Sequence, residues 1–416
     1  MKTFLVIVSA VVLGVTLAVA IGIWGGPLSS GALWLMWPPR TRYLANDRPP
    51  SFTPLHQGYV DAATGLYIRE DDDFALTQSL PFALRRTYLS MYHSRKEFGV
   101  GTTSNAEWYL RGDSKTFQWA ELILADGGRV HFTRTSSGTS YSNALFIHRT
   151  TPSEFFNAQL GWTGFQWALR FWDGSLATFN DCGPGARSVC ALTRLTDSYG
   201  RVSRFNRDRD GTLRSIDTTS EHLQFEYDDQ RRVVRIENGT GETVKYVYDV
   251  NGRLVQSRSS DGVVRAYSYG PRDEMLTIQE PGRTIENTYD EQLRVVRQVV
   301  HVTGQPAYIE TLAYTIANGA VQQTVIVDND GTRTELRFDD RHNEAVELHQ
   351  RASGPPVVIS FDRVGADFLR SLTVRCMRNG RHVTETVPFY ANQNATIRDL
   401  ISRACDGVVL FGKTGS

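Results

Sequence analysis

The chain has 416 residues, enough for a sizeable buried core and for two or three domains. It carries 45 lysines and arginines against 45 aspartates and glutamates, so its formal net charge is zero and we expect no nucleic-acid partner held by bulk electrostatics. Glycine is abundant, with 35 residues, which favours short strands and turns over helices.

Residues 1–24 form an apolar targeting segment. Phe4 to Trp24 reads FLVIVSAVVLGVTLAVAIGIW, and after Lys2 no charged residue follows until Arg40. At a helical rise of about 1.5 Å per residue this run is about 30 Å long, the thickness of a bilayer core. Residues 18–20 also match the A-x-A pattern of a signal-peptidase site. The segment is therefore a membrane anchor or a cleaved signal peptide, and in both cases we expect an exported protein, either membrane-anchored or secreted or periplasmic.

Residues 25–57 are rich in proline and glycine and lack periodicity, which predicts a linker. Residues 58–195 show short alternating strands. Residues 121–134 and 167–180 each place apolar residues on both sides of a turn, at Asp126-Gly127-Gly128 and at Asp173-Gly174. Glycine accepts positive φ and aspartate tolerates the turn, so both segments predict β-hairpins in a β-rich domain.

Residues 196–363 are repetitive. Four segments align on a leading tyrosine, at spacings of 21, 21 and 20 residues: Tyr227, Tyr248, Tyr269 and Tyr289. A helical-pair repeat needs roughly 30 residues or more, whereas one β-hairpin fits this period. We therefore expect an all-β array of hairpins, with the repeat tyrosines facing its core.

The best copy runs from Tyr248 to Leu254 as YDVNGRL, and it resembles the YD repeat of bacterial Rhs proteins, wall-associated proteins and animal teneurins. The preceding stretch, with Ala63-Thr64-Gly65, Leu80-Pro81-Phe82 and Arg85 to Tyr88, is similar to the domain that opens the core of many Rhs proteins. The resemblance covers residues 58–363.

The resemblance implies hairpins that join into one long sheet, wound into a hollow shell. In Rhs proteins this shell encloses a C-terminal toxin, which many members release by self-cleavage at an aspartate motif. This chain has only about seven recognisable units and lacks the P-x-x-x-x-D-P-x-G-L-type motif. We therefore expect a curled or partly closed sheet and infer neither an enclosed toxin nor self-cleavage.

The four cysteines are Cys182, Cys190, Cys376 and Cys405. No C-x-x-C pattern occurs, so we expect no metal site. An even number of cysteines in an exported chain favours two disulfides, and the local pairing (182 with 190, 376 with 405) is the simplest of three. Free thiols are the alternative.

Residues 364–416 have a pattern of their own. Two strand-like runs meet at Asn379-Gly380, a favoured hairpin turn, and residues 394–405 have helical spacing. This hairpin and helix form either a cap on the open end of the sheet or a docking module. Residues 407–414 match a Walker A pattern, but too few residues follow for the helix that a P-loop needs, so we expect no cofactor.

The sequence contains no H-E-x-x-H and no G-x-S-x-G motif, so we expect no enzyme. The carboxylate run from Glu70 to Asp73 lacks EF-hand spacing and is interpreted as a solvated turn. Flat aromatic faces bind sugars and partner proteins, and they also fill cores. The candidate binding residues of this kind are Trp108, Trp119, Trp162, Trp167 and Trp172.

The function that these observations favour is an exported, envelope-associated YD-repeat scaffold or binding protein with a carbohydrate or protein partner. A component of an Rhs-type polymorphic toxin system is one alternative. A hydrolase without a local motif is the other.

Overall fold

The computed structural model describes residues 60–75, 82–90, 93, 95–113, 115–125, 127–149, 155–181, 190–339, 344–351, 354–364 and 368–388. These residues form strands and turns, with two short 3₁₀ turns and no α-helix. No helix in this part of the chain is long and apolar enough to cross a membrane. The predicted N-terminal apolar segment, the predicted linker at 25–57 and the predicted helix at 394–405 lie outside the described residues.

The elements, in chain order, are β1 (Ile68–Phe74), β2 (Leu84–Leu89), β3 (Arg95–Lys96), β4 (Gly99–Val100), β5 (Thr102–Ser104), η2 (Asn105–Glu107), β6 (Tyr109–Gly112), β7 (Trp119–Ile123), β8 (Arg129–Arg134), η3 (Tyr141–Asn143), β9 (Leu145–Ile147), β10 (Gln159–Trp162), β11 (Trp167–Arg170), β12 (Leu176–Phe179), β13 (Cys190–Thr196), β14 (Val202–Arg207), β15 (Leu213–Asp217), β16 (His222–Tyr227), β17 (Val233–Asn238), β18 (Thr243–Tyr248), β19 (Leu254–Ser259), β20 (Val264–Tyr269), β21 (Met275–Glu280), β22 (Arg283–Tyr289), β23 (Val295–Val302), β24 (Tyr308–Ala317), β25 (Ala320–Asp328), β26 (Arg333–Phe338), β27 (Glu344–Gln350), β28 (Val357–Val364), β29 (Phe368–Arg378) and β30 (Arg381–Pro388).

Strands β6 to β13 close into a barrel. Each pairs antiparallel with the next, and β13 returns to β6 where Cys190 and Ala191 lie opposite Leu110 and Tyr109. The later part of β13, up to Thr196, pairs instead with β14. Strand β13 is therefore the junction at which the barrel passes into the repeat array.

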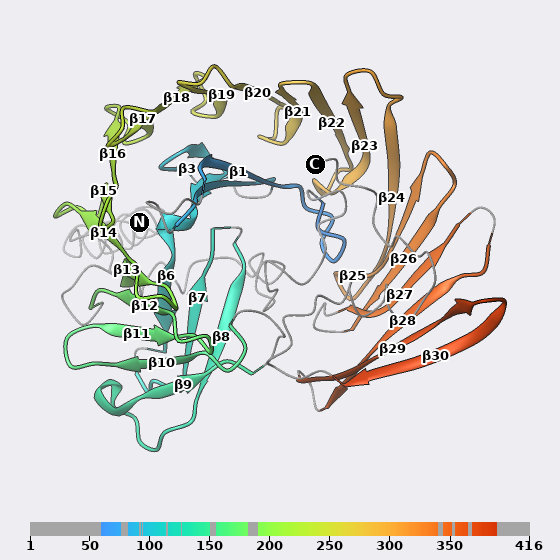
Figure 1. The fold of residues 1–416 in the computed structure, drawn as a ribbon, viewed down its shortest axis with the longest axis horizontal. Helices are drawn as coiled ribbons and strands as arrows, with labels where there is room; N and C mark the ends of the chain where they lie inside the picture. The colour runs from blue at the N-terminus through green and yellow to red at the C-terminus, as the bar shows by residue number, and fades with distance from the viewer. Residues whose placement is uncertain are drawn as a thin grey trace, which may run out of the picture.

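From β14 to β30 each strand pairs antiparallel with its successor, and the sheet curves into an arc (Figure 1). Side chains alternate between the two faces: in β16, Leu223 and Phe225 are buried and their neighbours are exposed. The prediction of an all-β, curled array of YD hairpins is confirmed. The predicted hairpin at Asn379-Gly380 is β29–β30, where both turn residues have positive φ, and it extends the array.

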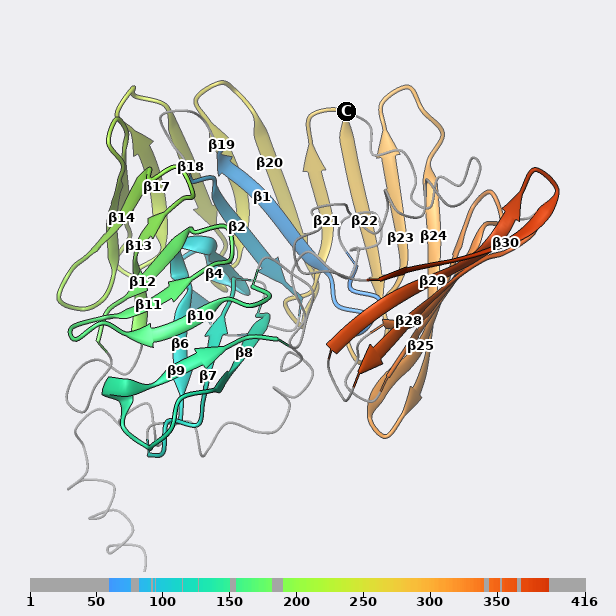
Figure 2. The ribbon, with the colours of Figure 1, turned by 60° about the horizontal axis from the view of Figure 1, so that its bottom comes forward.

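The described residues between 60 and 107, here called the inner segment, lie within the arc (Figures 1 and 2). They form the sheet β1-β2-β5 and the small hairpin β3–β4. Their aromatic rings contact rings of the array edge-on, Phe82 on Phe205 and Phe98 on Tyr246, each at 5.2 Å between centroids. One part of the core therefore sits between the inner segment and the concave face of the array, and another part lies in the barrel, around Phe132 and Phe179.

Candidate functional site

Each regular repeat unit closes its turn with one aspartate. In the unit that starts at Tyr248, the Asp249 carboxylate accepts backbone N–H bonds from Asn251 (3.0 Å) and Arg253 (2.9 Å) and a bond from the Arg253 guanidinium (2.7 Å). Asp228 and Asp290 make the same three contacts in their units. The fourth turn position needs positive φ, which Gly252 adopts at 85°. The aspartate therefore satisfies backbone donors that the turn would otherwise leave unpaired.

The leading tyrosine joins one unit to the previous one. Its hydroxyl donates to a backbone carbonyl of that unit, as from Tyr248 to Val233 (2.6 Å) and from Tyr269 to Leu254 (2.7 Å). Tyr227 and Tyr289 donate in the same way to Leu213 and Met275. All four repeat tyrosines are half-buried and pack against the core. They act as connectors between hairpins, since each is fixed at both its ring and its hydroxyl.

The unit that starts at Tyr269 departs from this pattern. Gly270 stands where the other units have aspartate, and Glu274 stands where they have arginine. The backbone turn is nevertheless retained, with bonds from the Gly270 N–H to the Glu274 carbonyl (2.8 Å) and from the Asp273 N–H to the Gly270 carbonyl (3.3 Å). A polar pocket of about 480 Å³ lies beside this turn, lined by Arg253, Pro271 and Asp273 among others.

The inner segment docks on four successive turns of the array. Three contacts are backbone hydrogen bonds: the Val233 N–H to the Glu97 carbonyl (2.7 Å), the Val100 N–H to the Gly252 carbonyl (3.0 Å) and the Val295 N–H to the Gly65 carbonyl (2.8 Å). The fourth uses a side chain, Tyr88. Its hydroxyl donates to the Asp273 carbonyl (2.8 Å) and accepts from the Met275 N–H (3.0 Å).

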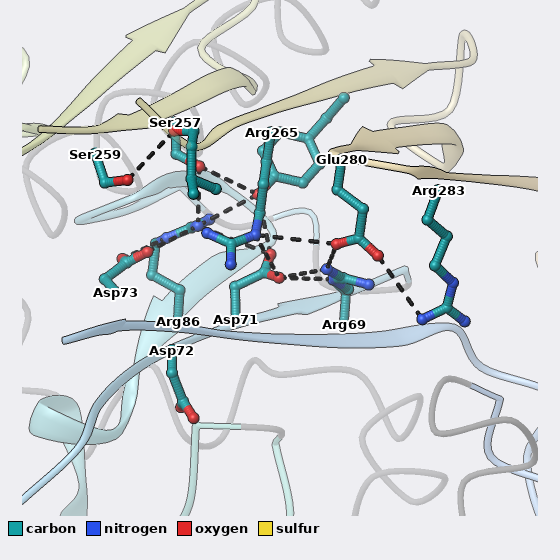
Figure 3. Close-up of polar contacts among 12 residues, drawn as sticks. Arg69, Asp71, Asp72, Asp73, Arg86, Ser257, Ser259, Arg265, Glu280 and Arg283 are labelled. Carbon is teal, nitrogen blue, oxygen red and sulfur yellow. Dashed lines mark hydrogen bonds and ion pairs between the residues drawn. The ribbon is translucent and has the colours of Figure 1, made fainter. Parts of the chain in front are cut away.

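A buried charge network reinforces this docking (Figure 3). Arg69, Asp71 and Asp73 share one face of β1 because side chains alternate along a strand, and Arg86 joins them from β2. Arg86 bonds Asp73 through Nε (2.6 Å) and Nη2 (3.0 Å). Asp72 points away from the network and bonds the exposed Arg85. The interpretation of residues 70–73 as a solvated turn was wrong, because they are part of a strand that is covered on one face.

Side chains of the array complete the network. The Tyr246 hydroxyl donates to Asp73 (2.7 Å), the Tyr267 hydroxyl donates to Asp71 (2.9 Å), and Arg69 donates to Glu280 (2.6 Å). Every oxygen of the Asp71 and Asp73 carboxylates thus accepts at least one hydrogen bond. The carboxylates serve as acceptors for the protein itself, an arrangement suited to fastening two segments together.

Burial and charge act in opposite directions in this network. Burial would raise the pKa of the Asp71 carboxyl, but the Arg69 and Arg86 guanidinium groups bring it below its ordinary value. Burial would lower the pKa of Arg86, but Asp73 above all raises it well beyond its ordinary value. Burial also raises the pKa of the Tyr267 hydroxyl to about 12. At neutral pH Asp71 and Arg86 are therefore charged, whereas the Tyr267 hydroxyl is neutral.

This network was not predicted from the sequence. Its members lie more than 170 residues apart in the cases of Tyr246 with Asp73 and Tyr267 with Arg86. The available signal was the alternation of Arg69, Asp71 and Asp73, which places three charges on one face of a predicted strand. Three charges on one strand face require partners if that face is covered.

The candidate tryptophans lie on and near the barrel and do not form one surface. Trp167 is buried, and Trp172, in the turn after β11, is 44% exposed. Trp162 contacts Trp167 edge-on and also contacts Tyr141, both at 5.4 Å between centroids. Trp108 packs beside Phe155 and Trp119 stacks on His131. The rings of Trp108, Trp119 and Trp167 therefore pack against other side chains of the protein.

Cys190 and Cys376 are each in a disulfide. Cys182 and Cys405 lie outside the described residues, so the predicted pairing stays a prediction.

Two family models match parts of the chain. Residues 57–132, which contain the inner segment and the first barrel strands, match a domain of unknown function (DUF6531). Residues 248–285, which contain the complete unit at Asp249 and the departing unit at Gly270, match the RHS Repeat. A search of the curated proteins found no match.

Several solved structures are similar at low identity. The crystal structure of TcdB2-TccC3 without its hypervariable C-terminal region is 11% identical, with a TM-score of 0.32, over 74% of this chain and 21% of that chain. A Photorhabdus luminescens Tc holotoxin pore is 12% identical, with a TM-score of 0.30, over 79% of this chain and 19% of that chain. A porin-like protein from Bacteroides uniformis is 11% identical, with a TM-score of 0.22, over 55% of this chain and 91% of that chain. The chain thus spans about a fifth of the length of the TcdB2-TccC3 and holotoxin chains.

The repeat match and the geometry of the turns lead to the same assignment. The RHS Repeat match coincides with hairpins in which an aspartate closes the turn and a tyrosine joins successive units. The chain therefore carries repeats of the Rhs/YD type.

Proposed function

We propose that this chain is an exported, non-catalytic shell protein of an Rhs-type toxin system, whose curved array holds polypeptide against its concave face. The observation that carries the proposal is the way in which the array binds the inner segment. Three of four successive turns hold it by backbone hydrogen bonds, at Val233, Gly252 and Val295. Backbone contacts of this kind do not depend on the side chains of the bound segment, so a repeated turn suits the holding of polypeptide.

The rigidity of the array supports the same function. Each regular unit is closed by its own aspartate and is joined to its neighbour by a tyrosine, as at Asp249 and Tyr248. The sheet is continuous from β14 to β30. A shell of this construction keeps its curvature without a bound partner, because each unit is stabilised by its nearest neighbours.

A protease-protection experiment on the full chain tests this function. A flexible peptide with one protease site is fused after Ser416 and, in a separate variant, inserted into the exposed turn at Thr240-Gly241. We expect the fused peptide to be cleaved much more slowly than the inserted one. Equal cleavage rates would contradict the shell function. Growth arrest on cytoplasmic production of the chain would instead assign a toxic activity to the chain itself.

A second candidate function is sugar binding at the barrel. The rings of Phe117, Tyr141 and Trp162 contact one another in series, at 5.7 and 5.4 Å between centroids. Arg134 fixes the loops of the first two rings by donating to the Phe117 and Ser140 carbonyls (3.1 and 3.0 Å). Tyr141 is nevertheless 43% exposed, so a rigid loop presents an aromatic face on which a sugar ring can stack.

Tryptophan fluorescence titration with cellohexaose and chitohexaose tests this candidate. We expect saturable quenching that Tyr141→Ala removes. Tyr199→Ala is the matched control, because Tyr199 is also an exposed tyrosine, at 86%. Absence of quenching with both sugars, or equal loss in the two variants, would exclude this surface as their binding site.

A further inference from the structure

The departing unit at Gly270 exchanges the positions of its charges without losing them. The Glu274 carboxylate accepts from the Arg272 N–H (2.8 Å), the second residue after Gly270, where a regular unit uses its aspartate. A Cβ added at Gly270 would overlap this carboxylate. The arginine of this unit also stands at a different position of the turn. It is Arg272, which donates to the Glu291 carbonyl (2.7 Å) and to the Asp290 carbonyl (3.1 Å) of the next unit.

This exchange occurs at the one docked turn that the inner segment contacts through a side chain. The Tyr88 hydroxyl bonds the backbone groups on both sides of Glu274, at Asp273 and Met275. Its ring also packs edge-on against Tyr269, at 5.9 Å between centroids. Tyr88 is 3% exposed, so both of its hydrogen bonds are made away from water. The Glu274 side chain folds back against Gly270, which leaves these two backbone groups to Tyr88.

We propose that Tyr88, Gly270 and Glu274 set the register in which the inner segment docks along the repeat array. The contacts at the other three turns are backbone hydrogen bonds, two donated by an array N–H (Val233 and Val295) and one accepted by an array carbonyl (Gly252). Neighbouring units of the array carry the same backbone groups. At the unit at Gly270 one side chain, the Tyr88 hydroxyl, binds both the Asp273 carbonyl and the Met275 N–H. The inner segment thereby selects the unit at Gly270 among units that share the same backbone turn. The inference is independent of the proposed function, since both partners belong to this chain.

Restoring the regular residues in this unit tests the proposal. In the double variant G270D/E274R, the unit regains the aspartate and arginine of its neighbours, so we expect the array to stay folded. We expect the docking amides of Val100, Val233 and Val295 to exchange hydrogen about tenfold faster or more, as for loss of buried hydrogen bonds. Hydrogen exchange with mass spectrometry on the full chain measures both. Unchanged exchange at these amides would overturn the proposal.

Two further variants separate docking from general destabilisation. Tyr88→Phe keeps the ring and removes only the hydroxyl, so it should accelerate exchange at Met275 and at the three docking amides. An effect confined to Met275 would contradict a role in register. The variant D228G/R232E makes the reverse exchange in the unit that binds the inner segment through the Val233 N–H. It should leave docking unchanged, and equal loss of docking in this control would also overturn the proposal.

Discussion

The Arg232 guanidinium carbon lies 4.5 Å from the centre of the Tyr248 ring, so the cation of one repeat unit covers the tyrosine that begins the next. Arg253 and Arg294 take the same position over Tyr269 and Tyr314. Each such arginine is itself held by the aspartate of its own turn. Closure of one hairpin and attachment of the next therefore depend on the same residue.

Replacement of Tyr248 by alanine should destabilise the fold by about 3–5 kcal/mol, as for other large aromatic truncations. The ring packs against the core and its hydroxyl bonds the Val233 carbonyl. Tyr248→Phe keeps the ring, so it should lose only about 1 kcal/mol for the hydrogen bond. Urea unfolding of both variants measures the difference. A loss below about 1 kcal/mol in the alanine variant would show that this ring adds little to the core.

Acid should destabilise the array through its turn aspartates. Burial would raise the pKa of Asp249, but the Arg253 backbone N–H and guanidinium bring it below the ordinary value. A lowered folded-state pKa contributes stability that is present above the unfolded value, about 3.9, and is lost as the pH falls through the folded value. Asp249→Asn should therefore flatten the decline in unfolding free energy below about pH 4. An unaltered acid profile in this variant would count against the aspartate contribution.

Glu97 should have the opposite pH dependence. Burial and the neighbouring Glu107 raise the pKa of Glu97 to about 7. A raised folded-state pKa means that stability is complete below the unfolded value and declines as the pH rises toward the folded value. The positive charge of Lys96 acts on Glu97, and that of Arg207 acts on Glu107. Both charges limit the loss of stability at higher pH.

At about pH 4 the Glu97→Gln variant should therefore have the same free energy of unfolding as the parent protein. At about pH 8 its free energy of unfolding should be larger by about 1–3 kcal/mol, a range that allows for the partial exposure of Glu97. Glutamine keeps an acceptor for the Ser104 N–H, which Glu97 binds at 3.0 Å. Glu226→Gln is the control, because Glu226 is half exposed, at 51%. A stability difference that does not change with pH would refute the role of ionisation.

Arg86→Met should cost about 3–5 kcal/mol, because it leaves Asp73 as an uncompensated buried charge. The neighbouring Arg85→Met is a matched control on the same strand. Arg85 is 42% exposed and pairs with the exposed Asp72, so its loss should cost less than about 1 kcal/mol. Equal losses in thermal unfolding would show that the network around Arg86 does not fasten the inner segment.

The repeat array could be predicted from the sequence because its contacts are local. Asp249 and Arg253 are four residues apart, and Tyr248 reaches a carbonyl 15 residues back, within one period. Such contacts leave a spacing that is readable in the chain. The tryptophans left no comparable pattern: Trp167 is buried and Trp172 lies in the following turn, so strand alternation did not apply to both.

The sequence by itself determined the hairpin period, the turn residues and the packing of the repeat tyrosines against the core, since these follow from backbone geometry over a few residues. Only the tertiary structure decided that β13 pairs with both β6 and β14, and that the inner segment lies within the arc. It also decided that Tyr246 meets Asp73 and that Tyr88 meets Asp273. These pairs depend on the curvature that the sheet accumulates over many strands. The two-residue alternation along a strand shows on which face a side chain lies, but it does not show which segment covers that face.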